Sequence, residues 1–304
     1  MVVARSWLVV AAVASACGRI DFDPRLATLD GSDSGLAADA MPACTMFGPW
    51  GTPRVIGELA TARDEFGGQI MSDNLTLYFD RHGGGDEIYV ARRPDRSSPF
   101  GPAQQLPELG TNSFEGSASA TADELELYFE SSRSGRACIY RATRATATAM
   151  WDPPAQVAAL CTSPNNGAYV TPDGLTLFYN SASAADPEGV IMVTTRASRT
   201  VPFPTGTPAG GGLAGGATKG YCNLASDGLT LYFETGSPTD LYQVARSGPG
   251  SPWGTPSQIP GMNTATIEQD VSITTDGLEL FFASNRVGSM GLDLYVASRA
   301  CLAF

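Results

Sequence analysis

The sequence has little positive charge. Among its 304 residues, lysine and arginine together number 19, against 31 aspartates and glutamates, so the formal net charge is -12. Lys219 is the only lysine. Phosphate backbones and anionic lipid surfaces repel such a protein. We therefore exclude nucleic acid as a partner and expect contact with a membrane only through a lipid anchor.

The motifs of several chemistries are missing. No Cys-x-x-Cys pair occurs and His82 is the only histidine, so the sequence predicts no zinc or other metal site. Gly-x-Ser-x-Gly is absent, and nothing in the sequence places a nucleophile or carboxylate beside His82, which we interpret as a solvated loop residue. Glycines at 210–215 match Gly-x-Gly-x-x-Gly in letters only, because no helix follows them. We predict no cofactor.

Long apolar runs are also lacking. A helix that spans a bilayer needs about 20 apolar residues, and the sequence has no run of that length. The run from Trp7 to Val13 follows Arg5 and precedes small residues, which predicts an export signal over residues 1–16. Ala14-Ser15-Ala16-Cys17 resembles the bacterial lipobox, although the lipobox prefers Leu where Ala14 stands. The resemblance implies lipidation of Cys17, and an ordinary cleaved signal is the alternative. Residues 17–43, rich in Asp, Gly, Ser and Ala, are predicted to be a flexible acidic tether.

An eight-residue pattern recurs five times along the rest of the chain. Each copy places an aspartate in a tight turn before an alternating Leu-x-Leu-aromatic run, as in Ser226-Asp227-Gly228-Leu229-Thr230-Leu231-Tyr232-Phe233. Such a run is typical of a strand with one buried face, so each repeat contains a predicted hairpin. We interpret the turn aspartates as structural, because their side chains can accept from backbone amides two residues on. They are Asp73, Asp123, Asp173, Asp227 and Asp276.

Every repeat continues with a third strand and an arginine, and the first four continue further with an aromatic residue and then Gly or Pro. The last repeat ends at Phe304 without this aromatic element, whereas Trp50-Gly51-Thr52-Pro53 supplies one before the first repeat. A ring closed by its own N-terminal outer strand explains this offset. The sequence therefore predicts an all-β, five-bladed β-propeller of four-stranded blades over residues 44–304. The blades are expected at 64–110, 114–161, 165–212, 218–262, and 267–304 with 44–58.

These repeats resemble the WD-like propeller repeats of the TolB-like envelope family. That family's units read Ser-x-Asp-Gly, then Tyr-Phe, then Ser-x-Arg and Asp-Leu-Tyr, and Ser284-Asn285-Arg286 and Asp293-Leu294-Tyr295 match best. The resemblance covers nearly all of residues 64–304. It implies a propeller in a bacterial cell envelope, periplasmic or surface-facing, but no particular activity. The family's named member has six blades, whereas this chain has five repeats.

Five cysteines remain after Cys17, in a chain predicted to enter an oxidising compartment. Cys44 precedes the closing strand and Cys301 follows the last third strand, so we predict a disulfide between them. Cys138 and Cys161 bracket the outer part of one blade and form the second predicted pair. Cys222 is expected to be buried and free.

Four carboxylates are candidates for a ligand-binding face. Glu65, Glu115 and Glu268 occupy one repeat position at the start of the innermost strand, and Asp270 lies two residues beyond Glu268. Such a ring could attract a cation or a basic group to the channel mouth. The alternative is that each carboxylate accepts backbone hydrogen bonds from a neighbouring blade.

Two arginines are candidates for an anion contact. Arg81 and Arg286 are expected to pair with Asp86 and Asp293 of their own blades. Blade two lacks an equivalent aspartate, which predicts that Arg133 is unpaired and, with Arg136, available to a ligand.

We therefore hypothesise a monomeric, non-enzymatic binding or scaffold module that recognises an envelope protein or polysaccharide through one propeller face. No catalytic residue is assigned. The alternative is an envelope glycoside hydrolase, which needs two carboxylates flanking the glycosidic bond, drawn from the four candidates above.

Overall fold

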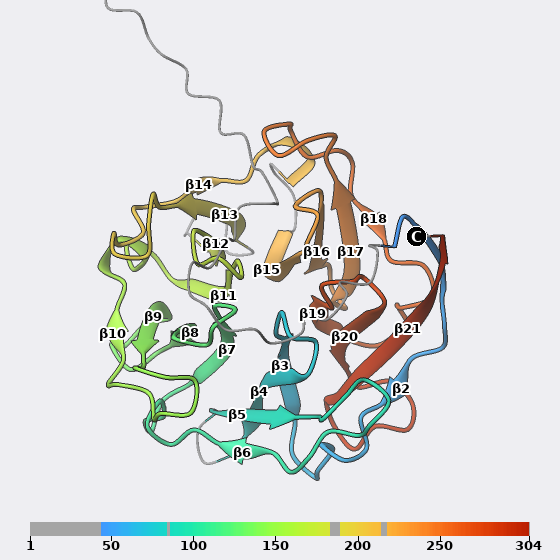
Figure 1. Ribbon diagram of the computed structural model, residues 1–304, viewed down its shortest axis with the longest axis horizontal. Helices are drawn as coiled ribbons and strands as arrows, with labels where there is room; N and C mark the ends of the chain where they lie inside the picture. The colour runs from blue at the N-terminus through green and yellow to red at the C-terminus, as the bar shows by residue number, and fades with distance from the viewer. Residues whose placement is uncertain (1–43, 84–85, 183–188, 214–217, 304) are drawn as a thin grey trace, which may run out of the picture. The chain divides into compact units, whose positions relative to one another are not determined.

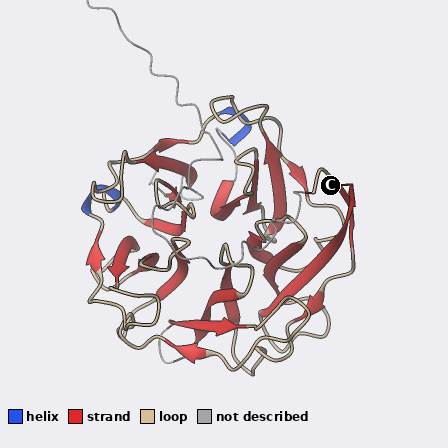
Figure 2. Cartoon of the chain, viewed as in Figure 1, coloured by secondary structure: helices blue, strands red, loops and turns tan. Residues whose placement is uncertain are grey.

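The computed structural model describes residues 44–303 except 84–85, 183–188 and 214–217. These residues form five antiparallel sheets arranged as blades around a central axis (Figure 1). Within these described ranges, helix is confined to two single 3-10 turns, Ala158–Leu160 and Gly211–Leu213 (Figure 2). No helix among the described residues is long and apolar enough to cross a membrane. The predicted five-bladed all-β propeller is confirmed, while the predicted signal, Cys17 and the tether lie outside the described residues.

The strands of each blade follow one another from the axis to the rim. Blade one contains β3 (Glu65–Ile70), β4 (Thr76–His82), β5 (Asp86–Arg92) and β6 (Gln104–Gln105). Blade two contains β7 (Glu115–Ala120), β8 (Glu126–Ser131), β9 (Cys138–Thr143) and β10 (Ala155–Gln156). Blade three contains β11 (Asn165–Val170), β12 (Thr176–Ser181), β13 (Val190–Thr195) and β14 (Thr207–Pro208). Blade four contains β15 (Thr218–Leu224), β16 (Thr230–Thr235), β17 (Asp240–Ala245) and β18 (Ser257–Gln258).

Blade five closes the ring with both ends of the chain. Its strands β19 (Glu268–Ile273), β20 (Glu279–Ser284) and β21 (Asp293–Ala303) are joined by β1 (Met46–Trp50) and β2 (Arg54–Val55), which both pair with β21. The closure therefore uses two N-terminal strands, not the single one predicted. The outer strands elsewhere also have only two residues and begin just after the aromatic and proline segment, because proline has no N–H to give to a strand ladder.

The repeated aspartates hold the turns as predicted. Asp227 Oδ1 accepts the backbone N–H of Leu229 at 2.7 Å, and the other four turn aspartates accept the equivalent N–H at 2.9 to 3.1 Å. The residue after the aspartate has a positive φ in all five turns; three of them have glycine there, as at Gly174 (72°), while Asn74 and Glu124 adopt 59° and 52°. The leucine four residues after the aspartate is fully buried in every blade: Leu77, Leu127, Leu177, Leu231 and Leu280.

The arginine after each third strand also stabilises the fold of its blade. Arg196 stacks on Phe203, with 4.4 Å from Cζ to the ring centroid, and donates from Nε to the carbonyl of Gly174 at 2.7 Å. Each pairing of this kind ties a turn to the outer part of its blade. The other pairs are Arg93 with Phe100, Arg144 with Trp151, Arg246 with Trp253, and Arg299 with Trp50.

Both predicted disulfides are present. Cys44 is bonded to Cys301 where the ring closes, and Cys138 is bonded to Cys161 in blade two. Cys222 is buried and free, also as predicted. Because β1 and β2 join β21, the first disulfide fastens the rim of the ring across 257 residues of sequence.

Candidate binding site at the propeller axis

Glu115, one of the four candidate carboxylates, has no exposed surface. Thr111 donates to it from both its backbone N–H and its hydroxyl, at 2.7 Å each, and Ser131 donates from its hydroxyl at 2.8 Å. Arg133 Nη2 lies 3.4 Å from Glu115 Oε1 and also donates to the carbonyl of Leu109. The carboxylate therefore holds the connection that precedes its own strand.

Glu65 and Glu268 are held in the same manner. Glu65 is bound by Thr61 and by Arg81, at 2.8 Å from Nε, and Glu268 is bound by Thr264 and by Arg286, at 3.3 Å. Both glutamates are fully buried. This favours the alternative in which the three carboxylates maintain the fold, with partners in their own blade and its leading connection and not in a neighbouring blade.

The prediction that Arg133 is unpaired is wrong. Besides its contacts with Glu115 and Leu109, its guanidinium lies over the rings of Phe129 and Tyr140, 5.3 and 4.9 Å from their centroids. The glutamate of the innermost strand takes the place of the expected aspartate. The sequence pattern missed this because Glu115 lies on the innermost strand, whereas Arg133 lies in the loop after the second strand.

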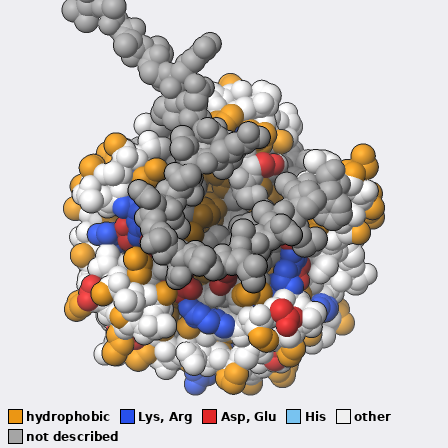
Figure 3. Space-filling view, viewed as in Figure 1, with side chains coloured by type: hydrophobic (Ala, Val, Ile, Leu, Met, Phe, Trp, Pro, Cys, Tyr) orange, Lys and Arg blue, Asp and Glu red, His pale blue; other side chains and the backbone are white. Residues whose placement is uncertain are grey.

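Arg286 likewise pairs with Glu268 and not with Asp293, which instead accepts the N–H of Met290 at 3.0 Å. Arg81 pairs with Glu65, and the side chain of Asp86 lies outside the described residues. Arg136 is exposed, and its guanidinium donates to the carbonyl of Cys161. Basic and acidic side chains lie side by side on the face seen in Figure 3, as expected where arginines pair with carboxylates.

Asp270 belongs to a different set of contacts, at the axis itself. In blades one, two and five the innermost strand bulges at its third residue, which has a positive φ of 63° at Gly67, 56° at Ser117 and 59° at Asp270. The N–H of this residue is donated to a carboxylate of the preceding blade. Ser117 donates to Asp80 at 2.7 Å, Gly67 donates to Asp270 at 2.9 Å, and Asp270 donates to Glu234. Carboxylates at the axis thus join neighbouring blades by hydrogen bonds.

Asp80 and Glu234 are not among the residues predicted from the sequence, although the sequence contains a signal for them. Both directly follow an aromatic residue of the second strand, and the same position holds Glu130, Asn180 and Ala283 in the other blades. Ala283 has no side-chain acceptor, and in blade five Asp270 supplies one from the innermost strand instead. The signal for these axial residues is therefore a position that varies between blades while the residues on either side of it repeat.

Side chains from blades that are not neighbours meet across the axis. Tyr221 of blade four donates from its hydroxyl to Glu130 of blade two at 3.5 Å, a long hydrogen bond. Two residues further along β15, Asn223 donates to Gln69 of blade one at 3.1 Å. Described side chains therefore span the axis at two positions along its length.

Burial raises the pKa of Asp270 to about 6, while the hydrogen bonds from Gly67 and from Gln269 act to lower it. Its Oδ1 atom has no hydrogen-bond partner among the described residues. Burial also raises the pKa of Tyr221, with the charges of Glu130 and Asp270 adding to the effect. A carboxyl group with a pKa near 6 has the acidity of a general acid. No cluster of three or more His, Cys, Asp or Glu suited to a metal ion occurs within the described ranges.

A second feature lies on the loop face, the side of the ring that carries the connections between second and third strands and between blades. A shallow cavity of about 480 Å³ is lined there by Ala62, Arg63, Asp64, His82 and Gly83. Arg63 and His82 are exposed, while Asp64 accepts the N–H of Leu292 from blade five at 2.8 Å. This cavity places three ionisable residues on the surface where blades five and one meet.

No protein-family model matches the sequence, and no curated protein matches it. Several solved structures, however, have a similar fold. The catalytic domain of a GH62 α-L-arabinofuranosidase from Coprinopsis cinerea is 12% identical with a TM-score of 0.52, over 78% of this chain and 91% of that one. A β-1,2-mannobiose phosphorylase from Listeria innocua is 8% identical with a TM-score of 0.54, over 79% and 90%.

A putative TolB from Agrobacterium tumefaciens is 15% identical with a TM-score of 0.50, over 80% of this chain and 82% of that one. The chain spans about half, 53%, of the TolB protein of Acinetobacter baumannii, which it matches at 12% identity and a TM-score of 0.48. At such identities the likeness shows the fold alone. The predicted resemblance to TolB-like propellers is thus confirmed at the level of architecture, and neighbours of that architecture include both TolB proteins and carbohydrate-active enzymes.

Proposed function

We propose that this protein is a non-enzymatic binding or scaffold module of a bacterial cell envelope, tethered by a lipid on Cys17, that recognises protein or polysaccharide through its loop face. Two disulfides support an oxidising compartment, because such bonds persist outside the cytosol. The proposal concerns the propeller as a monomer.

The proposal rests mainly on the axial carboxylates, whose hydrogen bonds join neighbouring blades. Asp80, Asp270 and Glu234 each accept a backbone N–H from a neighbouring blade, and the first two have no exposed surface. A carboxylate in that role stabilises the ring. Carboxylates that flank a glycosidic bond must instead leave room for sugar and water between them.

The loop-face cavity supports recognition at that side. Arg63 and His82 are exposed there, next to Asp64, and polar and charged groups of this kind orient a ligand by hydrogen bonding. The cavity lies on the loop face where blades five and one meet, and its charged residues are not repeated, since Ser113-Phe114 and Thr266-Ile267 stand at the positions of Arg63-Asp64. Features that break the repeat are the better candidates for function, since repeated features serve the fold.

The experiment is retention of envelope proteins and cell-wall polysaccharide on the immobilised mature protein. Arg63→Ala and His82→Ala should each reduce retention of the same partner at least about tenfold, the effect of losing a charged hydrogen bond. Met150→Ala is the matched control, because Met150 is 73% exposed on the opposite face. Retention that survives both loop-face substitutions, or falls equally in Met150→Ala, would contradict recognition through the loop face.

One observation favours the alternative of a glycoside hydrolase. Asp270 combines a pKa raised by burial to about 6 with an Oδ1 atom that has no described partner, as suits a general acid. The test is release of sugar from the same polysaccharide, measured for the wild type and for Asp270→Asn. Release that disappears in the variant would support the hydrolase and overturn the scaffold proposal.

A further inference from the structure

The blades also meet on the turn face, which carries the aspartate turns and the connections between third and fourth strands. We call the contact there a seam, where the terminal arginine of one blade reaches the second strand of the blade before it. Two of the five seams contain a network of ion pairs, and the other three have threonine in place of its central carboxylate, at Thr76, Thr176 and Thr230, and no arginine in place of its second cation. Of these three, the seam between blades four and five contains a cavity.

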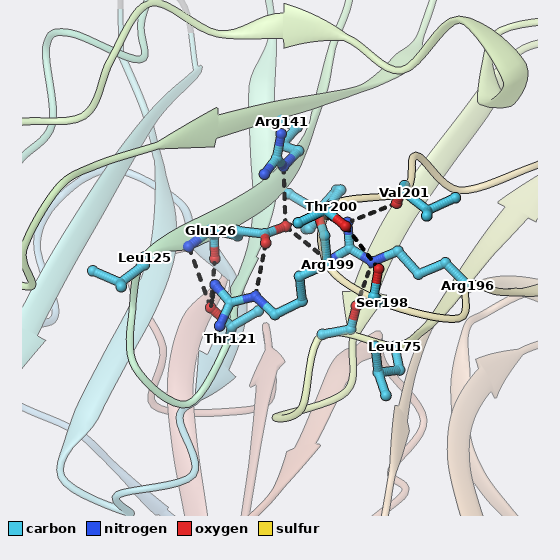
Figure 4. A network of polar contacts seen from close by, with 12 residues as sticks. Thr121, Leu125, Glu126, Arg141, Leu175, Arg196, Ser198, Arg199, Thr200 and Val201 are labelled. Carbon is cyan, nitrogen blue, oxygen red and sulfur yellow. Dashed lines mark hydrogen bonds and ion pairs between the residues drawn. The ribbon is translucent and has the colours of Figure 1, made fainter. Parts of the chain in front are cut away.

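The seam between blades two and three is complete. Glu126 accepts from Arg196 Nη2 at 2.8 Å and from Arg199 Nε at 2.7 Å, and Arg199 also reaches Asp123 at 2.5 Å. Figure 4 shows Arg141, Arg196 and Arg199 all directed at Glu126. A carboxylate thus lies between two guanidinium groups, one of which continues to a second carboxylate.

The seam between blades five and one repeats this arrangement. Glu279 takes the place of Glu126 and accepts from Arg93 at 2.5 Å and from Arg96 at 3.1 Å. Arg96 also pairs with Asp276, which stands where Asp123 does in the other network. The chain therefore uses the same four charges twice.

The seam between blades four and five keeps two of these charges and lacks the other two. Thr230 stands at the position of Glu126, and Leu302 stands at the position of Arg199. Arg299 and Asp227 remain, as the counterparts of Arg196 and Asp123. The missing pair is one carboxylate and one cation.

Neither remaining group forms a salt bridge among the described residues, although Arg299 is hydrogen-bonded to Tyr232 and the charge of Asp227 acts on Arg246. Arg299 donates from Nε to the carbonyl of Gly277 at 2.7 Å and stacks on Phe47 and Trp50, 3.8 and 4.2 Å from their centroids. Asp227 is exposed and accepts only backbone N–H groups, from Leu229 at 2.7 Å and from Thr230 at 3.3 Å. The nearby Asp276 is neutralised by Arg96 from blade one.

A cavity of about 630 Å³ occupies this seam, against about 510 Å³ at the seam of blades two and three. The walls correspond, with Tyr232 in the place of Tyr128 and Gln243 in the place of Arg141. Arg299, Asp227 and Thr230 all line the larger cavity, together with the apolar side chains of Phe47 and Ile273. The cavity is therefore next to two charged groups that form no salt bridge within the described part of the chain.

We propose that the seam between blades four and five binds a small zwitterion of the α-amino-acid class, its carboxylate paired with Arg299 and its ammonium group with Asp227. The ligand would supply the two charges that Glu126 and Arg199 supply within the chain. Charge-assisted hydrogen bonds fix both ends, and Phe47, Tyr232 and Ile273 accept an apolar side chain. This site is independent of the loop-face proposal, which stands whether or not the zwitterion binds.

Calorimetric titration of the mature protein with L-leucine tests the inference. Two analogues are matched controls: 4-methylpentanoate lacks the ammonium group, and 3-methylbutylamine lacks the carboxylate. Leucine is expected to bind saturably, and each analogue to bind at least about tenfold more weakly, because one charged hydrogen bond is lost. Absence of binding by leucine, or equal affinity for an analogue, would overturn the assignment.

Substitutions at the seam test whether leucine binds between blades four and five. Thr230→Glu supplies the missing carboxylate beside Arg299 and should abolish leucine binding, whereas Thr176→Glu makes the equivalent change at the seam of blades three and four and should leave it intact. Asp227→Asn keeps an acceptor for Leu229 and should weaken leucine about tenfold without weakening 4-methylpentanoate. It provides the second test should Thr230→Glu fail to fold, as judged by circular dichroism. Wild-type affinity in Thr230→Glu or Asp227→Asn would contradict the proposal.

Discussion

Asp270 in blade five accepts the backbone N–H of Gly67 in blade one at 2.9 Å, across 203 residues of sequence. The same bond between adjacent blades one and two is made by Asp80 and Ser117. Asp270 is needed because the second strand of blade five carries Ala283 where blade one carries Asp80. The ring is therefore closed by this carboxylate at the axis and by the Cys44–Cys301 disulfide at the rim.

Replacing Asp270 by asparagine should stabilise the protein at neutral pH. Burial raises the pKa of Asp270 to about 6 from an ordinary value of 3.8, so its contribution to stability is fully present below about pH 4 and is lost as pH rises through 6. Asparagine keeps an acceptor for Gly67 without a buried charge. We expect the free energy of unfolding of Asp270→Asn to exceed that of the wild type by about 1–3 kcal/mol at pH 7.5 and to match it near pH 4, measured by urea denaturation.

Asp270→Ala is the control for this experiment. It removes the acceptor as well as the charge and leaves the N–H of Gly67 buried without a partner, which costs about 1–3 kcal/mol at any pH. A pH-independent difference between Asp270→Asn and the wild type would contradict the raised pKa.

The two disulfides should contribute unequally. The Cys44–Cys301 bond closes a loop of 257 residues and the Cys138–Cys161 bond one of 23, and the loss of denatured-state entropy grows with loop length. We expect the double serine variant of the first pair to lose about 1–2 kcal/mol more than that of the second. Guanidinium denaturation of both variants gives the comparison, and an equal loss would mean that strain or residual structure dominates.

Glu115→Gln should damage stability and not recognition. The substitution leaves Arg133 without its charged partner inside the blade, and breaking a buried pair in this way costs about 3–5 kcal/mol. Thermal melting should show the loss. The folded variant should retain the same envelope partner as the wild type at a temperature well below its midpoint, and selective loss of the partner there would assign Glu115 to the ligand.

The seam of blades two and three should make the protein sensitive to strong acid. Burial raises the pKa of Glu126, but hydrogen bonds from Arg199, Arg196 and Arg141 outweigh it and hold the pKa at about 2, below the ordinary 4.5. The resulting stability is present above pH 4.5 and is lost as pH falls toward 2.

Glu126→Gln should therefore lower the free energy of unfolding by roughly 1–3 kcal/mol at pH 7 and flatten its decline between pH 4.5 and 2. Melting curves across that range measure both effects. Thr176→Gln serves as the control, since the seam of blades three and four has threonine at this position. A decline in acid as steep as that of the wild type would place the acid-sensitive group elsewhere.

The architecture could be predicted because its signals are local and repeated. The turn aspartates, the buried leucines and the terminal arginines recur in every blade, and each contacts residues within its own blade. The offset of Trp50 from the last repeat was enough to predict closure, and the positions of Cys44 and Cys301 followed from it.

The axis could not be predicted in the same way, because its contacts join different blades. Asp80 and Ser117 belong to different blades, and Tyr221 meets Glu130 across the ring. Arg133 was misjudged for a related reason, since its carboxylate partner comes from the innermost strand and not from the loop that contains Arg133. The sequence pattern identified Asp270 but not the N–H that it accepts.

The most direct test measures sugar release and partner retention side by side for the wild type and Asp270→Asn. If the axial carboxylates serve the ring, neither protein releases sugar, both retain the same partner, and the variant is the more stable at pH 7.5. Sugar release by the wild type that is abolished in a folded Asp270→Asn would contradict the account and make the axis an active site.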